Sequence, residues 1–598
     1  MTDMAMGLPL RQVFERAFAT HDGVELFYRH WPAVHGPTRG AIVLFHRGHE
    51  HSGRMAHLVD EFALPDFDFF AWDSRGHGRS PGARGDSPSF GTSVRDVQTF
   101  VDHIGEQHGF APRDIGIVAQ SVGAVLVATW AHDYAPAIRC MVLASPAFKV
   151  KLYVPFALPG LRLMRRLFGN FFVKSYVKAR FLTRDPSRIA SYDSDPLLSR
   201  AISVNVLLGL QEAADRVVAD AQAITVPTQL LVSGSDWVVY HRPQHAFFDR
   251  LGASVKERHV LHGFLHDTLG ERDRLLAVDR MRAFLLRIFT TPIAAPNLDD
   301  ADQFGFTREE ADALGAPLSP LSPRGLYWAA TRANLRFGGL LSDGIRLGHA
   351  TGFDSGSSLD YVYRNRAGGQ TPLGRLVDRI YLDAIGWRGI RQRKLDVEAL
   401  LCESMARLRA GGKPVHILDV AAGHGRYVLD AVAACGSGDV HGASGRPDSI
   451  ELRDYVPVNV DKGNALIRER GLSDIARFAL GDAMDRQKLA ALSPKPTLGV
   501  VSGLYELMPD NGPVRRSLAG LADAIEPGGF LVYTGQPWHP QLELIARALT
   551  SHRRGVAWLM RRRTQQELDQ LVAAAGFRKL AQRIGESGIF TVSLAQRL

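Results

Sequence analysis

A serine stands on a short turn between an apolar segment and a helix-forming one. Residues 116–124 read Gly-Ile-Val-Ala-Gln-Ser-Val-Gly-Ala, an apolar strand followed by a small-x-Ser-x-Gly turn. A serine on such a turn is exposed at the end of the strand, and its small neighbours let adjacent elements pack closely. We therefore predict that Ser121 is a nucleophile, although a serine here could also serve only as a helix N-cap. Ala119 stands where this turn usually has glycine.

A serine hydroxyl becomes a nucleophile when a base removes its proton and a carboxylate orients that base. Asp236 follows a predicted strand at residues 229–232, and His266 follows the next one at residues 258–261. The ends of parallel strands lie at one edge of a sheet, so we expect both side chains to reach Ser121. His262 is the alternative base, but it lies nearer to its strand and is interpreted as structural.

Two further loops complete a recognisable pattern. Residues 46–54 read His-Arg-Gly-His-Glu-His-Ser-Gly-Arg, and residues 73–80 read Asp-Ser-Arg-Gly-His-Gly-Arg-Ser. Together with the serine turn, these loops resemble the monoacylglycerol lipase and lysophospholipase branch of the α/β-hydrolases, over about residues 20–290. The chain order serine, aspartate, histidine is also that of this family. The resemblance implies serine-dependent hydrolysis of a lipid-like carboxylic ester, of the monoacylglycerol or lysophospholipid type.

The resemblance also implies an oxyanion hole. Its donors would be the backbone N–H of Val122 and that of Arg47 or Gly48. The family pattern His-Gly-x-Gly-Glu-His has lost both of its glycines here, where Arg47 and His49 replace them. His49 and His51 are interpreted as loop histidines and not as metal ligands, because no matching carboxylate pattern accompanies them. No metal site is predicted.

A glycine-bearing turn in the second half of the chain indicates a nucleotide-type cofactor. Residues 415–426 read Val-His-Ile-Leu-Asp-Val-Ala-Ala-Gly-His-Gly-Arg, an apolar strand, a turn and the start of a helix. Alone this is a weak signal, because nicotinamide dinucleotides use a similar turn. Two later predicted strands end in acids, Asp454 and Asp482. The turn lacks the third glycine that close approach to a pyrophosphate requires, which favours a cofactor without one.

These features resemble the class I S-adenosylmethionine-dependent methyltransferases, over about residues 395–598. A predicted antiparallel hairpin, at residues 577–583 and 589–595, matches the end of their sheet. The resemblance implies S-adenosylmethionine as cofactor, and the residues expected to hold it are Asp419, Gly423 and Gly425 for the methionine moiety, Asp454 for the ribose, and Asp482 and Ala483 for the adenine. Residues 502–506 would face the methyl acceptor. Two alternatives stay open: a fold retained without activity, and a regulatory module that only binds the cofactor.

Length and segment pattern give the domain organisation. A chain of 598 residues exceeds what one hydrophobic core supports, and alternating apolar and helical segments indicate two doubly wound α/β domains. The predicted parts are an α/β-hydrolase domain at residues 1–290 with a helical lid at about 149–223, a Pro-, Ala-, Asp- and Ser-rich linker at 291–330, a helical preamble at 331–394, and a Rossmann-like class I methyltransferase domain at 395–598. The preamble either caps the acceptor pocket or packs between domains.

The lid carries a concentration of positive charge in a chain of net charge +9. Basic and apolar side chains alternate there: the basic ones are Arg162, Arg165, Arg166, Lys174, Lys178 and Arg180, and the apolar ones are Leu163, Met164, Leu167, Phe168, Phe171, Phe172, Tyr176 and Phe181. The pattern is typical of a helix lying on an anionic membrane surface, and equally of a solvated face over a core. No nucleic-acid-binding motif accompanies the charge, so nucleic acid is not an expected partner.

The three cysteines, Cys140, Cys402 and Cys435, are far apart and show no metal-binding or disulfide spacing. We therefore predict no disulfide, and a reducing compartment. Residues 1–16 carry no apolar core with a cleavage site, and no run of about 18 apolar residues occurs. The expectation is a cytoplasmic enzyme, peripheral at the inner membrane face if the lid binds lipid.

Overall fold

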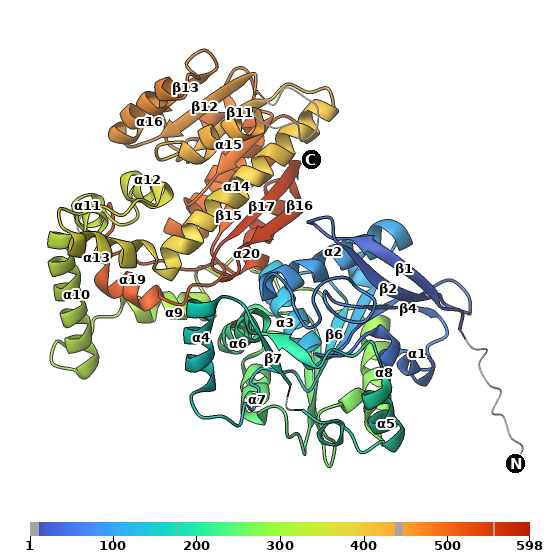
Figure 1. Cartoon of the computed structure of the whole chain (residues 1–598). Helices are drawn as coiled ribbons and strands as arrows, with labels where there is room; N and C mark the ends of the chain where they lie inside the picture. Colours follow the sequence, from blue (N-terminus) through green and yellow to red (C-terminus); the bar gives the residue numbers. More distant parts are fainter. Residues whose placement is uncertain (1–10, 176, 437–445, 554–556) are drawn as a thin grey trace, which may run out of the picture. The chain divides into compact units, whose positions relative to one another are not determined.

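The chain forms two compact units, Met1–Pro296 and Asn297–Leu598. This computed structural model describes residues 11–175, 177–436, 446–553 and 557–598 (Figure 1). Residues 1–10 and Tyr176, on which two of the predictions above partly rest, lie outside the described residues. Both units contain a mixed, mostly parallel sheet between helices, so the predicted fold class of two α/β domains is confirmed. Within the described residues, no helix is long and apolar enough to cross a membrane.

The first unit is built on an eight-stranded sheet, in the order β1-β2-β4-β3-β5-β6-β9-β10. Its strands are β1 (Phe14–Ala19), β2 (Glu25–Trp31), β3 (Gly40–Phe45), β4 (Phe67–Trp72), β5 (Ile115–Gln120), β6 (Cys140–Ala144), β9 (Thr228–Ser233) and β10 (Lys256–Leu261). The six strands from β4 to β10 in this order are parallel to one another. Strands β1 and β2 form an antiparallel edge, in which β2 pairs with β4. The sequence did not predict β1, most of whose side chains are exposed and form no apolar run.

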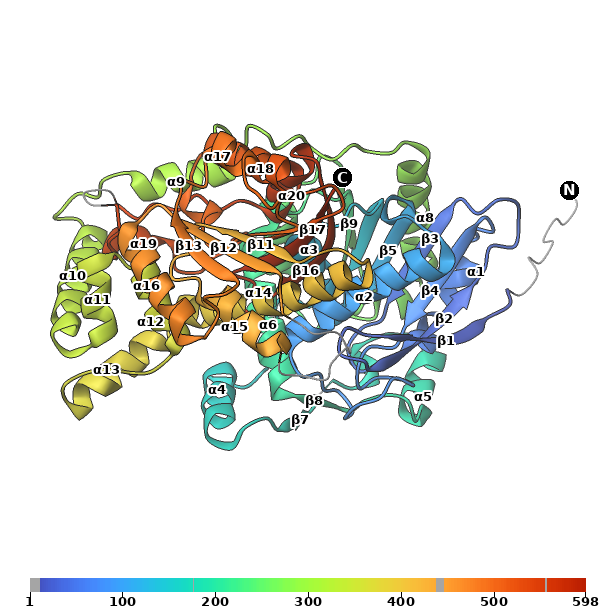
Figure 2. The same ribbon diagram turned by 90° about the horizontal axis from the view of Figure 1, so that it is seen from above.

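Helices cover both faces of this sheet. On one face, α1 (His57–Glu61) packs on α8 (Leu275–Thr290), which contacts β6 and β9. The other face carries α2 (Phe90–His108), α3 (Val122–Tyr134) and α7 (His241–Arg250) (Figures 1 and 2). The strands between them are almost wholly apolar, as a sheet buried on both faces requires.

The predicted lid is inserted between β6 and β9. It contains α4 (Ala157–Phe168), β7 (Phe172–Lys174), α5 (Pro186–Ser194), β8 (Ala201–Ser203) and α6 (Val204–Ala219). Helix α6 packs on α2 and α3, whereas α4 has no buried residue. Only part of the basic stretch is therefore a free helical surface, because Ala179 and Leu182 further along are buried.

The second unit has a seven-stranded sheet, in the order β13-β12-β11-β14-β15-β17-β16. Its strands are β11 (His416–Val420), β12 (Ser449–Asp454), β13 (Ala476–Leu480), β14 (Leu498–Val501), β15 (Phe530–Gly535), β16 (Phe577–Ile584) and β17 (Thr591–Arg597). Strand β17 pairs antiparallel with both β15 and β16, and its pairing with β16 is the predicted terminal hairpin (Figure 1). The other neighbours in the sheet are parallel.

Helices precede this sheet in the chain. They are α9 (Phe306–Gly315), α10 (Pro323–Leu341), α11 (Asp343–Thr351), α12 (Gly356–Arg364), α13 (Pro372–Leu382) and α14 (Ile385–Ala410). Part of the predicted linker is thus helical and packed: α9 contacts α19 (Leu542–Ala548). One of the prolines taken as a linker signal, Pro323, instead starts a helix behind the N-cap Ser322.

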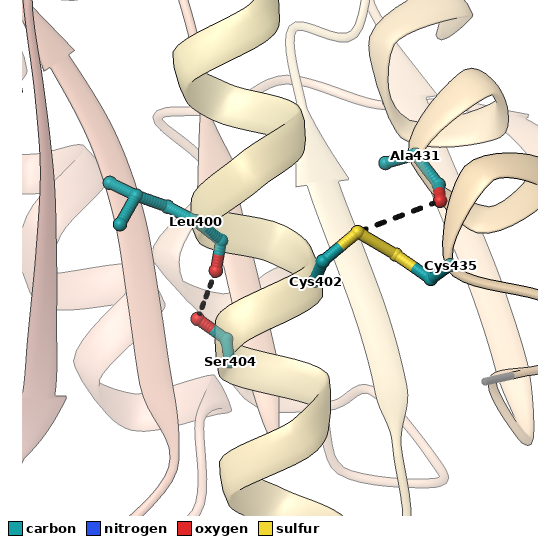
Figure 3. Close-up of a disulfide and its surroundings, with 5 residues drawn as sticks. All are labelled: Leu400, Cys402, Ser404, Ala431 and Cys435. Carbon is teal, nitrogen blue, oxygen red and sulfur yellow. Dashed lines mark hydrogen bonds between the residues drawn. A yellow bond between two sulfur atoms is a disulfide. The ribbon is translucent and has the colours of Figure 1, made fainter. Parts of the chain in front are cut away.

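A disulfide links Cys402 to Cys435, and the prediction of no disulfide is therefore wrong (Figure 3). The two cysteines lie on α14 and on α15 (Arg426–Gly436), which pack side by side and bring their Cα atoms to 5.9 Å. The separation of 33 residues in the sequence does not indicate a disulfide, because the pairing depends on how the two helices pack. The inference of a reducing compartment from isolated cysteines loses its support. Cys140 is free and buried.

Candidate active sites in the two units

Ser121 lies on a sharp turn between β5 and α3. Its backbone has φ +55° and ψ −115°, a conformation that side-chain-bearing residues rarely adopt. The turn is tight, because a Cβ at Gly123 would collide with the carbonyl oxygens of Phe45 and His46 on the next strand. Ala119, where glycine is usual, is a buried strand residue with room for its methyl group. The strained turn presents the serine hydroxyl beyond the end of the sheet.

The structure brings together the three side chains named as nucleophile, base and orienting acid. The Ser121 Oγ lies 2.7 Å from His266 Nε2, and His266 Nδ1 lies 2.7 Å from Asp236 Oδ2. All three residues are buried. His262, the alternative base, is exposed and outside this chain of hydrogen bonds. The arrangement allows a proton to pass from the hydroxyl to an imidazole that a carboxylate holds in place.

The Asp236 carboxylate is kept ionised by its partners. Burial alone raises its pKa, but the attraction of His266 and hydrogen bonds from His266 and from the backbone N–H groups of Val238 and Val239 outweigh burial. The net effect lowers the pKa of Asp236 below its ordinary value. An ionised carboxylate at Nδ1 fixes the tautomer in which Nε2 faces the serine.

The predicted oxyanion loop lies beside the nucleophile. A Cβ at Gly48 would come within 3.0 Å of the Val122 side chain, so the backbone of this loop and the start of α3 are adjacent. The Val122 N–H begins a helix and has no partner within it. His49, which replaces a family glycine, has φ +70°. The loop therefore keeps the left-handed conformation that favours glycine, at the cost of backbone strain.

A buried ion network under the site was not predicted. Arg47, expected only as a backbone donor, uses its side chain to bind Glu50 at 2.8 Å. Asp267 binds Arg188 of the lid at 3.0 Å and accepts a hydrogen bond from Gln120 at 3.1 Å. Gln120 also donates to the carbonyl oxygen of His266 at 3.2 Å, so this network holds the histidine loop. Sequence order alone gives no signal for such contacts, since the lid supplies one of the partners.

A cavity of about 150 Å³ opens beside Ser121 and His266. Most of its lining comes from the lid and is apolar, and includes Leu152, Val173, Ile202, Leu207 and Leu210. The predicted oxyanion residues Arg47, Gly48 and Val122 also border it. A hydrocarbon chain would lose its contact with water in such a cavity, which favours binding of an apolar acyl group.

In the second unit, the glycine-bearing turn connects β11 to α15. Residues Ala421, Gly423 and Gly425 all have positive φ, and a Cβ at Gly425 would collide with Leu452. The Asp454 carboxylate, at the end of β12, accepts a hydrogen bond from the Gly423 N–H at 2.9 Å. This bond ties the turn to the second strand and places two of the predicted cofactor residues together.

Asp419, at the end of β11, has an unsatisfied oxygen. Its Oδ1 accepts a hydrogen bond from the Tyr427 hydroxyl at 3.1 Å, while its buried Oδ2 has no partner among the described residues. Burial raises the pKa of this carboxyl well above its ordinary value. A buried oxygen without a partner is costly, and an amino group supplied by a ligand would satisfy it.

The remaining predicted cofactor residues follow β13, the strand next to β12, where the Gly481 N–H donates to the Asp454 carbonyl oxygen at 3.0 Å. Asp482 is exposed and accepts a hydrogen bond from the Met484 N–H at 2.9 Å, and Ala483 is buried in the core. Neither lines the small cavity at the turn, which measures about 30 Å³. That volume holds about one water molecule.

Helix α12 of the preamble covers the turn. Its Asp360 lies 2.5 Å from Arg426 on α15, and its Ser357 lies 3.4 Å from His424 in the turn. Gly356, at the start of α12, lies 3.5 Å from the position of a Cβ at Gly423. These contacts leave only the small cavity of about 30 Å³ at the turn. The donor and acceptor groups there suit the methionine end of S-adenosylmethionine.

A larger cavity, of about 300 Å³, lies beyond β14 and β15. Gly503 and Glu506, within the segment predicted to face a methyl acceptor, line it together with preamble residues such as Trp387. Gln536 and His539, directly after β15, also line it and were not predicted. Their signal was present in the sequence, because polar residues that follow a buried parallel strand lie at the edge where α/β sheets bind ligands.

Comparison with known proteins finds a matching family or relatives for each half of the chain. A family model described as "Putative methyltransferase" matches residues 281–597, and one described as "Serine aminopeptidase, S33" matches residues 36–273. The protein YnbC of Escherichia coli is 54% identical over 98% of both chains. A mouse monoglyceride lipase is 31% identical over 41% of this chain and 80% of its own length. A monoacylglycerol lipase of Mycolicibacterium smegmatis is 27% identical over 46% of this chain and 96% of its own length.

Proposed function

Because the chain belongs to the family described as "Putative methyltransferase", and its N-terminal half is an α/β-hydrolase related to monoglyceride lipases, we propose a bifunctional enzyme. The first unit would hydrolyse a lipid-like carboxylic ester, of the monoacylglycerol or lysophospholipid type. The second would transfer a methyl group from S-adenosylmethionine. The observation that carries the hydrolase proposal is the hydrogen-bonded series Ser121, His266 and Asp236 beside an apolar cavity.

In the proposed hydrolysis, His266 removes the proton of Ser121 as its Oγ attacks the ester carbonyl carbon. The backbone N–H groups of Val122 and of Arg47 or Gly48 would stabilise the negative oxygen that forms. His266 then gives its proton to the departing alcohol, which leaves an acyl group on Ser121. Water activated by the same imidazole releases the acid and restores the serine.

The apolar cavity favours an ester of a fatty acid over a peptide, even though one matching family model is named for an aminopeptidase. A peptide substrate would need a partner for its free amino group, and the described cavity lining contains no Asp or Glu. The direct test compares release of fatty acid from a monoacylglycerol with release of a chromophore from an aminoacyl anilide. Faster turnover of the anilide would contradict the ester assignment.

For the second unit, the proposed cofactor contacts are the oxygens of Asp419 and Asp454 and the backbone of the turn at Gly423 and Gly425. Bound S-adenosylmethionine would supply an electrophilic methyl group. Asp419 Oδ2 supports this proposal most directly, since it is a buried acceptor without a partner in the described structure. The alternative is a module that binds the cofactor without methyl transfer. To distinguish the two, the protein is incubated with S-adenosylmethionine carrying a labelled methyl group and with extracted lipids, and transfer of the label to a lipid is measured.

We expect Asp454→Ala to weaken S-adenosylmethionine binding at least about tenfold, because the variant loses both a charged acceptor and the tether to the Gly423 N–H. Isothermal titration calorimetry measures the change. Asp474→Ala, at an exposed aspartate paired with Arg446, is the matched control and should bind like the parent. Equal affinities for all three proteins, or no heat with the parent, would rule out the assigned cofactor site.

We also propose that the lid contacts an anionic membrane surface. On α4, Leu163, Leu167 and Phe168 are exposed, by 58%, 65% and 74%, although large apolar side chains are usually buried. Arg165 and Arg166 on the same short helix are exposed as well. An exposed helix that is both apolar and cationic is typical of binding at a lipid interface.

We expect the parent to bind vesicles of phosphatidylglycerol and phosphatidylcholine, and the double variant Leu167→Glu/Phe168→Glu to bind them at least about tenfold more weakly, because two apolar side chains no longer enter the lipid. Cosedimentation measures both affinities. Leu321→Glu, at a leucine 85% exposed in the other unit, is the control. Salt-sensitive binding to DNA with none to vesicles would contradict the proposal and favour a nucleic-acid surface.

A further inference from the structure

The 300 Å³ cavity of the second unit contains several buried polar atoms without hydrogen-bond partners among the described residues. They are Arg393 Nε, Glu506 Oε2, Gln536 Nε2 and Trp558 Nε1, and each residue is at least nine-tenths buried. Buried polar groups in folded proteins are almost always paired, because an unpaired one costs about 1–3 kcal/mol. Four such groups in a single cavity indicate that a ligand supplies the missing partners.

The rest of the cavity lining is apolar. Aromatic and aliphatic side chains from the preamble, from α19 and from the residue before β17 enclose it, among them Ile345, Tyr381, Ile390, Ile545 and Phe590. Its volume of about 300 Å³ is at the lower end of that of small-molecule sites. The ligand therefore has an apolar body of modest size and a small polar group.

The polar atoms restrict the chemistry of that group. Arg393 and Glu506 lie 3.5 Å apart and form a buried pair without net charge, and Glu506 Oε1 also accepts a hydrogen bond from Thr534 at 2.8 Å. An additional carboxylate or phosphate would face the Glu506 carboxylate and be repelled. An ammonium group could donate to Glu506 but could accept nothing from Arg393 or Gln536. A neutral hydroxyl does both, because its oxygen donates one hydrogen bond and accepts others.

His539 adds a further donor without adding charge. Its Nδ1 accepts a hydrogen bond from the Gln541 N–H at 3.0 Å, and burial lowers the pKa of its imidazole to about 4. The neutral ring must then carry its proton on Nε2. That nitrogen lies 3.1 Å from the position of a Cβ at Gly386, another residue of the cavity lining.

We propose that this cavity binds an apolar alcohol, whose hydroxyl group donates to Glu506 Oε2 and accepts from Gln536 Nε2 or Arg393 Nε. The cavity adjoins the small cavity at the glycine-bearing turn, since Leu359 of α12 lines both. If the proposed methyltransferase function holds, this hydroxyl is the methyl acceptor and the reaction is methylation of oxygen. The oxygen would bond to the methyl carbon as the carbon–sulfur bond of S-adenosylmethionine breaks and leaves a thioether, and the hydroxyl proton would pass to Glu506 Oε2. The alcohol-binding part stands on the cavity alone.

The test uses the full chain, without S-adenosylmethionine, and 1-octanol as probe. Octyl methyl ether, which has the same chain but no O–H, is the matched comparison. We expect octanol to bind at least about tenfold more tightly than the ether in isothermal titration, because only octanol can donate to Glu506. Ala384→Phe, which places a ring in the cavity and leaves every polar group intact, should abolish binding of both.

Gln536→Met separates a binding role from a structural one. Methionine nearly matches glutamine in shape but has no N–H group that is left without a partner. We therefore expect the variant to unfold at the same temperature as the parent or higher. Its affinity for octanol should nevertheless fall at least about fivefold. Gln303→Met, at an exposed glutamine, is the control for both measurements.

Three results would overturn the proposal: equal binding of octanol and the ether, no binding of either to the folded parent, or a Gln536→Met protein that loses stability but keeps its affinity. These results are independent of cofactor binding. Octanol binding with no heat from S-adenosylmethionine would leave the alcohol site standing and refute methyl transfer, whereas the reverse pair of results would refute only the alcohol site.

Discussion

Replacing Ser121 with alanine is expected to lower the kcat for ester hydrolysis by at least about 10⁴-fold while the protein stays folded. The variant loses the oxygen that forms the acyl-enzyme in the proposed reaction. Within the described part of the chain, the Ser121 Oγ of the parent hydrogen-bonds only to His266, so its loss should leave the fold intact. The measurement is release of fatty acid from a monoacylglycerol, with circular dichroism to verify folding.

Ser194→Ala is the matched control, since Ser194 is an exposed lid serine far along the chain from the nucleophile turn. It should hydrolyse the ester at the rate of the parent. A Ser121→Ala protein that retained a tenth or more of the parent's kcat would show that another group performs the reaction.

The second large effect concerns the orienting carboxylate. Asp236→Asn should lower kcat by about 10⁴-fold, because an amide that donates to Nδ1 of His266 leaves a proton on Nε2, where the lone pair must face Ser121. Since the pKa of Asp236 is lowered, its carboxylate stays ionised as the pH falls below neutrality. Any stability that this ionised group provides is therefore present above its unfolded-state pKa and is lost only as the pH falls through its lower folded-state value.

Asp249→Asn, at an aspartate 66% exposed and paired with Arg258, removes the same charge away from the site and should keep full activity. Initial rates of ester hydrolysis at saturating substrate, measured from mildly acidic to neutral pH, give kcat for both variants. A loss of less than about tenfold in Asp236→Asn would mean that the carboxylate does not orient the base.

The hydrolase site could be predicted from sequence because its signals are local. The turn at Ser121 is marked by small residues next to an apolar strand, and Asp236 and His266 each follow a further strand of the same sheet. Parallel strands bring their ends to one edge, so chain order together with strand position leads to a three-dimensional expectation. The supporting contacts of Arg188 with Asp267 could not be predicted, because they depend on how the lid docks.

In the second unit, the local sequence predicts the residues at the strand ends but not the contacts between separate segments. The glycine turn and Asp454 could be predicted from the ends of β11 and β12, but the position of α12 over that turn could not. Gln536 lies directly after β15, one strand further along the sheet than the loop after β14 that was predicted to face the acceptor. The Cys402–Cys435 bond depends on the packing of α14 against α15. The sequence of neither helix indicates that the other packs against it.

Mass spectrometry after treatment with a fluorophosphonate tests the central claim most directly, since this reagent traps an activated serine and does not require the natural ester to be known. We expect one adduct per chain, on the peptide that contains Ser121. It should be absent from Ser121→Ala and form far more slowly in Asp236→Asn. An adduct on another serine, or no adduct with the folded parent, would contradict the central claim.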